Sequence, residues 1–145
     1  MNDTLVSLLS QALADVTIFY HRIHGFHWNV TGKDFPQWHS KFEEIYDDVY
    51  SSLDPIAENL RKIGVFAPFR LADLAKMASV ADAPVASYDP ATLVADLITT
   101  NAGVLVSLND AFQTATQANQ QGIANFIAER IDAHQKWAWQ LKASL

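Results

Sequence analysis

The chain of 145 residues contains no cysteine, fewer cationic than anionic residues, and no long apolar run. Without cysteine there can be no disulfide, thiolate metal site or thiol nucleophile, so a bound metal would need imidazole and carboxylate ligands. Lys and Arg number 10 against 16 Asp and Glu, giving a formal net charge of −6. No basic block of the kind that holds nucleic acid is present, and we expect cations to be the natural partners.

The absence of long apolar runs also argues against a membrane protein. No run approaches the roughly 20 apolar residues of a membrane span, and no cationic leader precedes the apolar residues of MNDTLVSLLSQALADV. We therefore expect a cytoplasmic protein with no membrane segment. Half of the residues are hydrophobic, enough for one well-filled core, and the chain is too short for two comfortable domains. A single domain over residues 1–145 is expected.

Apolar residues recur at helical spacing in four long stretches. The first extends from Leu5 to His27, the second follows Asp34 and ends near Gly64, the third follows Asp89, and the last begins near Ile123. Residues 64–90 carry three prolines around a candidate short helix, LADLAKMA. Four long helices with one long middle connection predict an all-α, ferritin-like four-helix bundle with a short extra helix in the crossover.

Two details of the second helix can be predicted from single residues. Asp34 is a plausible N-cap, with Pro36 in the first turn and Gln37 placed to reach back to it. Pro55 lies inside the helix, where it removes a backbone hydrogen bond and costs roughly 3 kcal/mol relative to alanine. The helix must kink or restart there, and we favour a kink.

Three of the five histidines lie in HGFHWNVTGKDFPQWH, residues 24–39. His21, His24 and His27 follow one another at intervals of three, and we interpret His21 and His24 as members of a half-buried stripe with hydrogen-bonded tips. His27 and His39 stand at similar separations before and after Gly32. Two antiparallel helices joined there would bring these two imidazoles to the same height, as two ligands of one metal require.

The second helix adds two pairs of potential ligands at i,i+4 spacing, His39 with Glu43 and Asp54 with Glu58. By itself, the second pair is more typical of a solvated acidic face. His39 and Asp54 are 15 residues apart, about 22 Å along a straight helix. They cannot bind the same metal within one chain. If the four groups form one site, the histidines and the Asp54/Glu58 carboxylates come from different subunits, and the spacing predicts a two-fold dimer.

Other types of site lack their motifs. A di-iron site inside one bundle needs Glu-x-x-His, and none of the five histidines has a glutamate three residues before it. No Ser/His/Asp motif, phosphate-binding glycine loop or basic aromatic groove is present either.

The segment HWNVTGKDFPQWHSKFEE, followed by DPIAE, resembles the signature of the Dps family, the mini-ferritins named for binding DNA in starved cells. The likeness covers nearly the whole chain. The resemblance implies a hollow dodecamer that oxidises Fe(II), preferably with hydrogen peroxide rather than O2, stores the ferric product and protects against oxidative damage. It also implies that His27 and His39 bind iron from one subunit, with Asp54 and Glu58 completing the site from its two-fold mate.

Some positions of the resemblance need comment. Glu43 takes the place usually held by aspartate, which lengthens that arm by one methylene. Zn²⁺ or Mn²⁺ could occupy the same imidazole and carboxylate ligands. Trp28 is adjacent to a ligand histidine, and we expect it to supply electrons during catalysis and to quench a radical formed at the iron. We interpret the other nearby aromatic residues as packing residues: Trp38, Tyr46 and Tyr50.

The chain departs from the family pattern in two respects. Many Dps proteins carry a lysine-rich tail, which this sequence lacks, and we expect no DNA binding. The family tends to place aspartates at the start of the last helix, lining the pore for iron, whereas amides stand at Gln120, Gln121 and Asn125 here. The nearest carboxylates are Glu129 and Asp132, so a weaker field for cations and slower iron uptake are expected.

Two alternatives to an iron-oxidising shell remain. One is a nucleoid-associated, DNA-binding structural protein with minor metal chemistry, which would need a basic surface and is disfavoured by the net charge of −6. The other is a helical assembly whose metal site has decayed, which is disfavoured because all five ligand positions hold residues able to bind metal.

Overall fold

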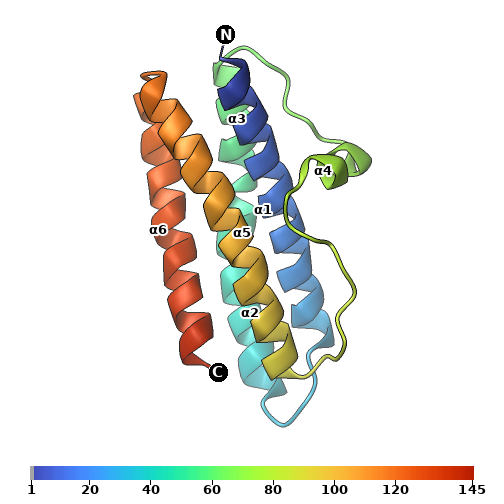
Figure 1. Cartoon of the computed structure of the whole chain (residues 1–145). Helices are drawn as coiled ribbons and strands as arrows, with labels where there is room; N and C mark the ends of the chain where they lie inside the picture. The colour runs from blue at the N-terminus through green and yellow to red at the C-terminus, as the bar shows by residue number, and fades with distance from the viewer. Residues whose placement is uncertain (1) are drawn as a thin grey trace.

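The computed structural model describes residues 2–145, which form six helices and no strand. These are α1 (Asp3–Asn29), α2 (Phe35–Ser51), α3 (Leu53–Lys62), α4 (Leu71–Met77), α5 (Pro90–Gln117) and α6 (Gln121–Ala143). The bundle consists of α1, α5, α6 and the consecutive pair α2 and α3, while α4 lies outside it (Figure 1). This arrangement confirms the expected ferritin-like four-helix bundle with a short helix in the crossover.

The helix ends follow local chemistry in most places. The side chain of Asp89 accepts a hydrogen bond from the Thr92 amide at 3.1 Å, and Pro90 opens α5. Gly64, at φ +90°, follows α3. Asp34 is the N-cap residue of α2 and Pro36 lies in its first turn, as predicted, but the Asp34 side chain makes no capping bond. The backbone of Asp34 (φ −100°, ψ 22°) is far from the extended conformation from which a cap usually reaches the helix amides.

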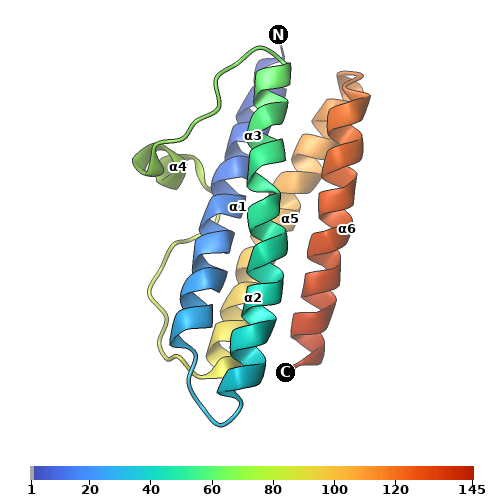
Figure 2. The ribbon, with the colours of Figure 1, turned by 180° about the vertical axis from the view of Figure 1, so that it is seen from behind.

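The expected single, kinked second helix is also wrong. The structure has two helices, interrupted at Ser52, so that Pro55 is the third residue of α3. An N–H in the first turn has no intrahelical acceptor, and its loss at Pro55 therefore costs no helical hydrogen bond. Ser52 keeps nearly helical angles (φ −85°, ψ −14°), and α3 follows α2 almost in line (Figure 2).

The crossover between α3 and α5 runs along the bundle and is anchored by a buried carboxylate (Figure 1). Asp15 of α1 has no exposed surface and accepts hydrogen bonds from the Ser79 amide and hydroxyl, both at 2.6 Å, and from the Val80 amide at 3.1 Å. The hydroxyl of Ser107 on α5 donates to the same carboxylate. A β-carbon at Gly103 would lie 2.6 Å from Val80 Cγ1, so glycine lets the crossover approach α5.

By length and composition alone, α5 is apolar enough to cross a membrane, a test that buried core helices also pass. Its apolar residues are interspersed with Thr, Ser, Asn and Gly, so a search for an unbroken apolar run does not find it. In the fold, α5 packs along both α1 and α6 and contributes buried leucines and valines to the core.

A polar network lies within the bundle between α2, α5 and α6. Arg130 makes two hydrogen bonds to Asp48, at 2.9 and 3.0 Å, and Trp137 Nε1 donates to the same carboxylate at 2.8 Å. His134 is fully buried, and its Nδ1 lies 2.8 Å from Asn101 Oδ1, to which it donates. The Arg130 guanidinium lies 3.3 Å from His134 Nε2. A neutral imidazole satisfies both contacts, with the proton on Nδ1 and a lone pair on Nε2.

This network predicts a loss of stability in acid. Burial, followed by the charge of Arg130, lowers the pKa of His134 from 6.5 to about 3. The unfolded chain therefore binds one proton more than the folded chain between these pH values, and stability falls as the pH drops below 6.5. Each unit by which the pH falls within this window should lower the free energy of unfolding by about 1.4 kcal/mol through His134.

Denaturant unfolding across the same pH range tests this prediction in wild type and His134→Gln. The variant should show a shallower dependence on pH, while the same change at the exposed His21 should leave the wild-type slope. Equal slopes in wild type and His134→Gln would show that His134 is not the titrating group.

Candidate metal centre

The short turn between α1 and α2 places His27 and His39 face to face. Their ring centroids are 3.7 Å apart, with an angle of 16° between the planes. The Nδ1 of each ring lies 2.7 Å from the backbone carbonyl oxygen of the other residue. Because a carbonyl only accepts, both Nδ1 atoms carry the proton and both Nε2 atoms present a lone pair. Fixing the tautomer through the other ring nitrogen is how proteins prepare histidine for metal binding.

Glu43 lies one turn after His39 on α2. Its Oε1 is 3.9 Å from His27 Nε2 and accepts a hydrogen bond from the Tyr46 hydroxyl at 3.5 Å. The Glu43 side chain is 55% exposed. A carboxylate therefore stands beside the imidazole pair but remains free to adjust its position.

Asp54 and Glu58 are exposed on α3 and share one face of that helix at i,i+4 spacing. Helix α3 lies further along the bundle from the α1–α2 turn (Figure 2), whereas His27 and His39 lie on the helical segments that flank this turn. Within residues 2–145, no three His, Asp or Glu side chains are grouped closely enough to hold a metal ion. Within one chain the imidazole pair and the Asp54/Glu58 carboxylates therefore lie apart.

An aromatic cluster lines the same side of α1 and α2. The His24 ring stacks on Tyr46, with centroids 4.1 Å apart, and its centroid lies 4.4 Å from that of Trp28. Trp28 is 62% exposed. The Tyr20 hydroxyl lies 2.8 Å from His24 Nδ1, so the half-buried tip of His24 is hydrogen-bonded, as predicted.

The cluster also includes Tyr20 and Tyr50 and reaches His27 through Tyr46. The centroid of Tyr46 is 5.2 Å from that of His27, and Tyr20 approaches Tyr50 to 5.0 Å. Tyr20 was absent from the predicted site, and its only signal in the sequence is its i,i+4 spacing to His24. His21 is exposed, and its ring lies 5.0 Å from that of Tyr20.

Burial and charge both act on this cluster. Burial lowers the pKa of His24, and repulsion from His27 and His21, when those rings carry a proton, lowers it further. Burial, then the negative charges of Glu43 and Asp47, raise the pKa of Tyr46. At neutral pH the imidazole is therefore neutral and the phenol protonated.

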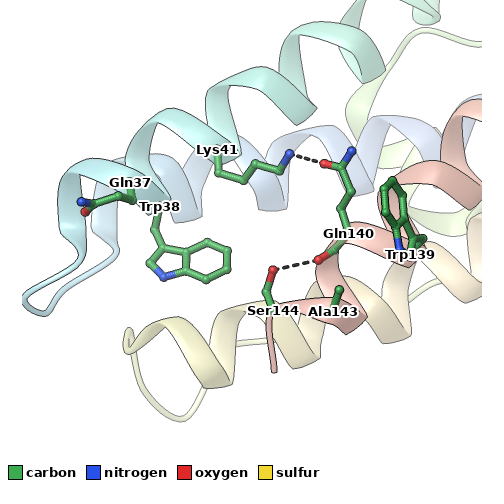
Figure 3. A pocket seen from close by; sticks show the side chains of 7 residues that line it. All are labelled: Gln37, Trp38, Lys41, Trp139, Gln140, Ala143 and Ser144. Atoms are coloured by element: carbon green, nitrogen blue, oxygen red, sulfur yellow. Dashed lines mark hydrogen bonds between the residues drawn. The ribbon is translucent and has the colours of Figure 1, made fainter.

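A groove elsewhere on the surface differs from the candidate metal centre in the residues that line it. A groove of about 440 Å³ lies between α2 and the end of α6, with Trp38 and Lys41 on one wall and Gln140 and Ser144 on the other (Figure 3). Lys41 donates a hydrogen bond to the Gln140 side chain across it. The groove is lined by no carboxylate or imidazole, so its chemistry does not suit a metal ion.

The amides expected at the iron pore lie at or near the start of α6, the nearest carboxylates follow further along the helix, and all are exposed: Gln120, Gln121, Asn125, Glu129 and Asp132. The amides lie nearer to the start of the helix than the two carboxylates. The expected weaker field for cations remains a prediction.

Comparisons with known proteins agree with the observed helical-bundle fold. The model of the ferritin-like domain family matches residues 6–145. A "DNA protection during starvation protein" of Brevibacillus brevis is 29% identical over 138 residues, which cover 95% of this chain and 92% of the relative.

Two solved structures have nearly the same fold. The Dps protein of Vibrio cholerae O1, described as a member of a broad superfamily of ferritin-like diiron-carboxylate proteins, has a TM-score of 0.92 and 27% identity, covering 97% of this chain and 88% of its own. Dps from Staphylococcus aureus has a TM-score of 0.93 and 26% identity, covering 99% of this chain and 96% of its own. The chain therefore belongs to the ferritin-like domain family and, within it, to the Dps proteins.

Proposed function

We propose that this protein is a mini-ferritin that oxidises Fe(II), preferably with hydrogen peroxide, at sites shared between two subunits. One subunit supplies His27, His39 and Glu43, and its two-fold mate supplies Asp54 and Glu58. The ferric product is stored in the cavity of a dodecamer. The protein is cytoplasmic and protects the cell against oxidative damage, and DNA binding forms no part of this role.

The single observation that carries the proposal is the reciprocal pairing of His27 and His39. Both imidazoles are oriented by a carbonyl at Nδ1, which leaves Nε2 of each ring as the atom available to a metal. Two stacked rings in ordinary packing would not need matched 2.7 Å bonds to each other's backbone. This arrangement suits two metal ligands, each held by its own supporting bond.

The set of donors favours iron as the substrate. Imidazole and carboxylate ligands suit Fe(II), and a site with few protein ligands leaves positions open for the oxidant. The same ligands would accept Zn²⁺ or Mn²⁺, which we expect to inhibit by occupying the site. The exposed Glu43 arm can move to meet a metal, and Asp54 and Glu58 are exposed and available to a second subunit.

Anaerobic loading of the purified protein with Fe(II), followed by hydrogen peroxide, tests this function. Ferric absorbance should rise faster than in protein-free buffer, and the mass in solution should be that of a large oligomer. The same experiment with O2 should be slower. Oxidation no faster than in buffer would support the decayed-site alternative.

We expect Trp28→Phe to increase the release of hydroxyl radicals during peroxide-driven oxidation. Trp28 is exposed and its ring lies against His24, so it is placed to donate an electron near the iron. Phenylalanine keeps an aromatic ring but is much harder to oxidise. Spin trapping during turnover measures the yield, with Trp139→Phe, another exposed tryptophan, as the matched control. An unchanged yield in Trp28→Phe would remove this role.

A further inference from the structure

The hydrogen bond between Tyr20 and His24 combines a redox-active phenol with a base. The Tyr20 hydroxyl lies 2.8 Å from His24 Nδ1, one turn along α1, and both side chains are half-buried. In the tautomer with the ring proton on Nε2, His24 Nδ1 accepts the phenolic proton in this bond. Oxidation of a phenol by one electron is easier when a base takes the proton at the same time, because no charged phenol cation forms.

A series of ring contacts connects this pair to the proposed iron site. The Tyr46 centroid lies 5.2 Å from His27, and His24 stacks on Tyr46 at 4.1 Å. Tyr20 lies 6.0 Å from Tyr46 and 5.0 Å from Tyr50, which is 59% exposed. At these separations an electron can pass directly between neighbouring rings. The chain of rings thus extends from a metal-binding imidazole to the protein surface.

We propose that Tyr20, hydrogen-bonded to His24, is a further donor beside Trp28 that supplies the second electron when peroxide meets a single Fe(II), with Tyr46 connecting it to the site. The inference rests on the proposed function, and it names an electron donor distinct from Trp28. The electron travels from Tyr20 through Tyr46, while the proton moves from the Tyr20 oxygen to His24 Nδ1. The product is a neutral tyrosyl radical at Tyr20.

The step balances with peroxide as the oxidant. Fe(II) gives one electron and Tyr20 the other, the O–O bond breaks, and two protons from solvent complete two water molecules. The sum is H2O2 + Fe²⁺ + Tyr20-OH + His24 + 2 H⁺, giving Fe³⁺ + 2 H2O, the Tyr20 radical and His24-H⁺. Reduction by two electrons leaves no hydroxyl radical, which a single electron from Fe(II) would release.

The surroundings hold the pair in its starting state, with the proton on the Tyr20 oxygen and His24 Nδ1 accepting the hydrogen bond. Burial, then Tyr50 and Asp47, raise the pKa of Tyr20, so the phenol keeps its proton until it is oxidised. The carboxylates of Asp47 and Glu43 also stabilise the imidazolium that forms.

Rapid freezing after peroxide is added to protein loaded with one Fe(II) per site tests the proposal, with electron paramagnetic resonance as the readout. Wild type should show a tyrosyl radical, and Tyr20→Phe should lose most of it and release more hydroxyl radical to a spin trap. Tyr88→Phe is the matched control, because Tyr88 is the remaining tyrosine outside the cluster, and it should keep the wild-type signal. A tyrosyl signal of wild-type size in Tyr20→Phe would overturn the proposal.

A second experiment uses no iron and therefore tests the Tyr20–His24 pair independently of the proposed iron oxidation. A photogenerated ruthenium(III) polypyridyl oxidant removes one electron from the metal-free protein, and optical absorbance follows the tyrosyl radical. Wild type should hold a long-lived radical whose formation slows in D2O, and both features should be lost in Tyr20→Phe and His24→Gln. Equal lifetimes in wild type and both variants would overturn the Tyr20 assignment. If the protein fails to oxidise iron but forms the Tyr20 radical in this metal-free experiment, only the proposed iron reaction is refuted.

Discussion

Replacing His39 with alanine is expected to slow peroxide-driven Fe(II) oxidation by about 100-fold or more, since loss of even a supporting partner of a metal ligand costs about 10–100-fold. The change removes one imidazole of the stacked pair and its hydrogen bond to the His27 carbonyl, while the His39 backbone carbonyl that accepts from His27 Nδ1 remains. Stopped-flow absorbance after anaerobic loading measures the rate, and light scattering measures the mass of the oligomer.

The control for this variant is His21→Ala, which removes an exposed imidazole from α1 without touching the pair. It should oxidise iron at the wild-type rate. The His39→Ala protein should still assemble, because it loses one partly exposed side chain and about 1 kcal/mol of hydrogen bonding. A His39→Ala oligomer with the wild-type rate would place the reaction elsewhere.

Replacing Asp15 with alanine is expected to lower the free energy of unfolding by about 3–5 kcal/mol. The carboxylate is fully buried and accepts from two amides and two hydroxyls, so its removal leaves buried donors without a partner. The crossover should then detach from α1 and α5. Denaturant unfolding at fixed protein concentration measures the loss, and limited proteolysis should show faster cleavage within residues 64–90.

Two matched variants bound the interpretation of this result. Asp15→Asn keeps one acceptor oxygen and should lose less stability than Asp15→Ala. Asp3→Ala removes an exposed carboxylate from the same helix and should change stability by no more than about 0.5 kcal/mol. A loss below about 1 kcal/mol in Asp15→Ala would mean that the crossover is fixed by other contacts.

The four long helices could be predicted because helical periodicity is local information. The position of the break in the second helix could not. Pro55 signals an interruption nearby, but the helix stops at Ser52, which lets Pro55 occupy a first-turn position. The polar pairs that stabilise the fold are also hidden in the sequence, because Asp15 meets Ser79 and Asp48 meets Arg130 from distant positions along the chain.

The same distinction applies to the candidate site. The meeting of His27 and His39 follows from their similar separations from a short turn, and the sequence therefore predicts it. Their exchange of bonds with each other's carbonyls depends on the detailed approach of α1 and α2, which no spacing reveals. Tyr20 was missed for a similar reason, because its partners Tyr46 and Tyr50 come from another helix.

A site shared between subunits is tested most directly by mixing two inactive variants, His39→Ala and Asp54→Ala. Each variant alone lacks one ligand at every site. In a mixed two-fold pair, one site carries both substitutions and the other carries neither, because the intact histidines of one chain face the intact carboxylates of its mate. Random assembly makes half of the pairs mixed, so co-assembled protein should recover about a quarter of the wild-type oxidation rate. Mixed oligomers, verified by native mass spectrometry, that oxidise iron no faster than either variant alone would contradict the shared site.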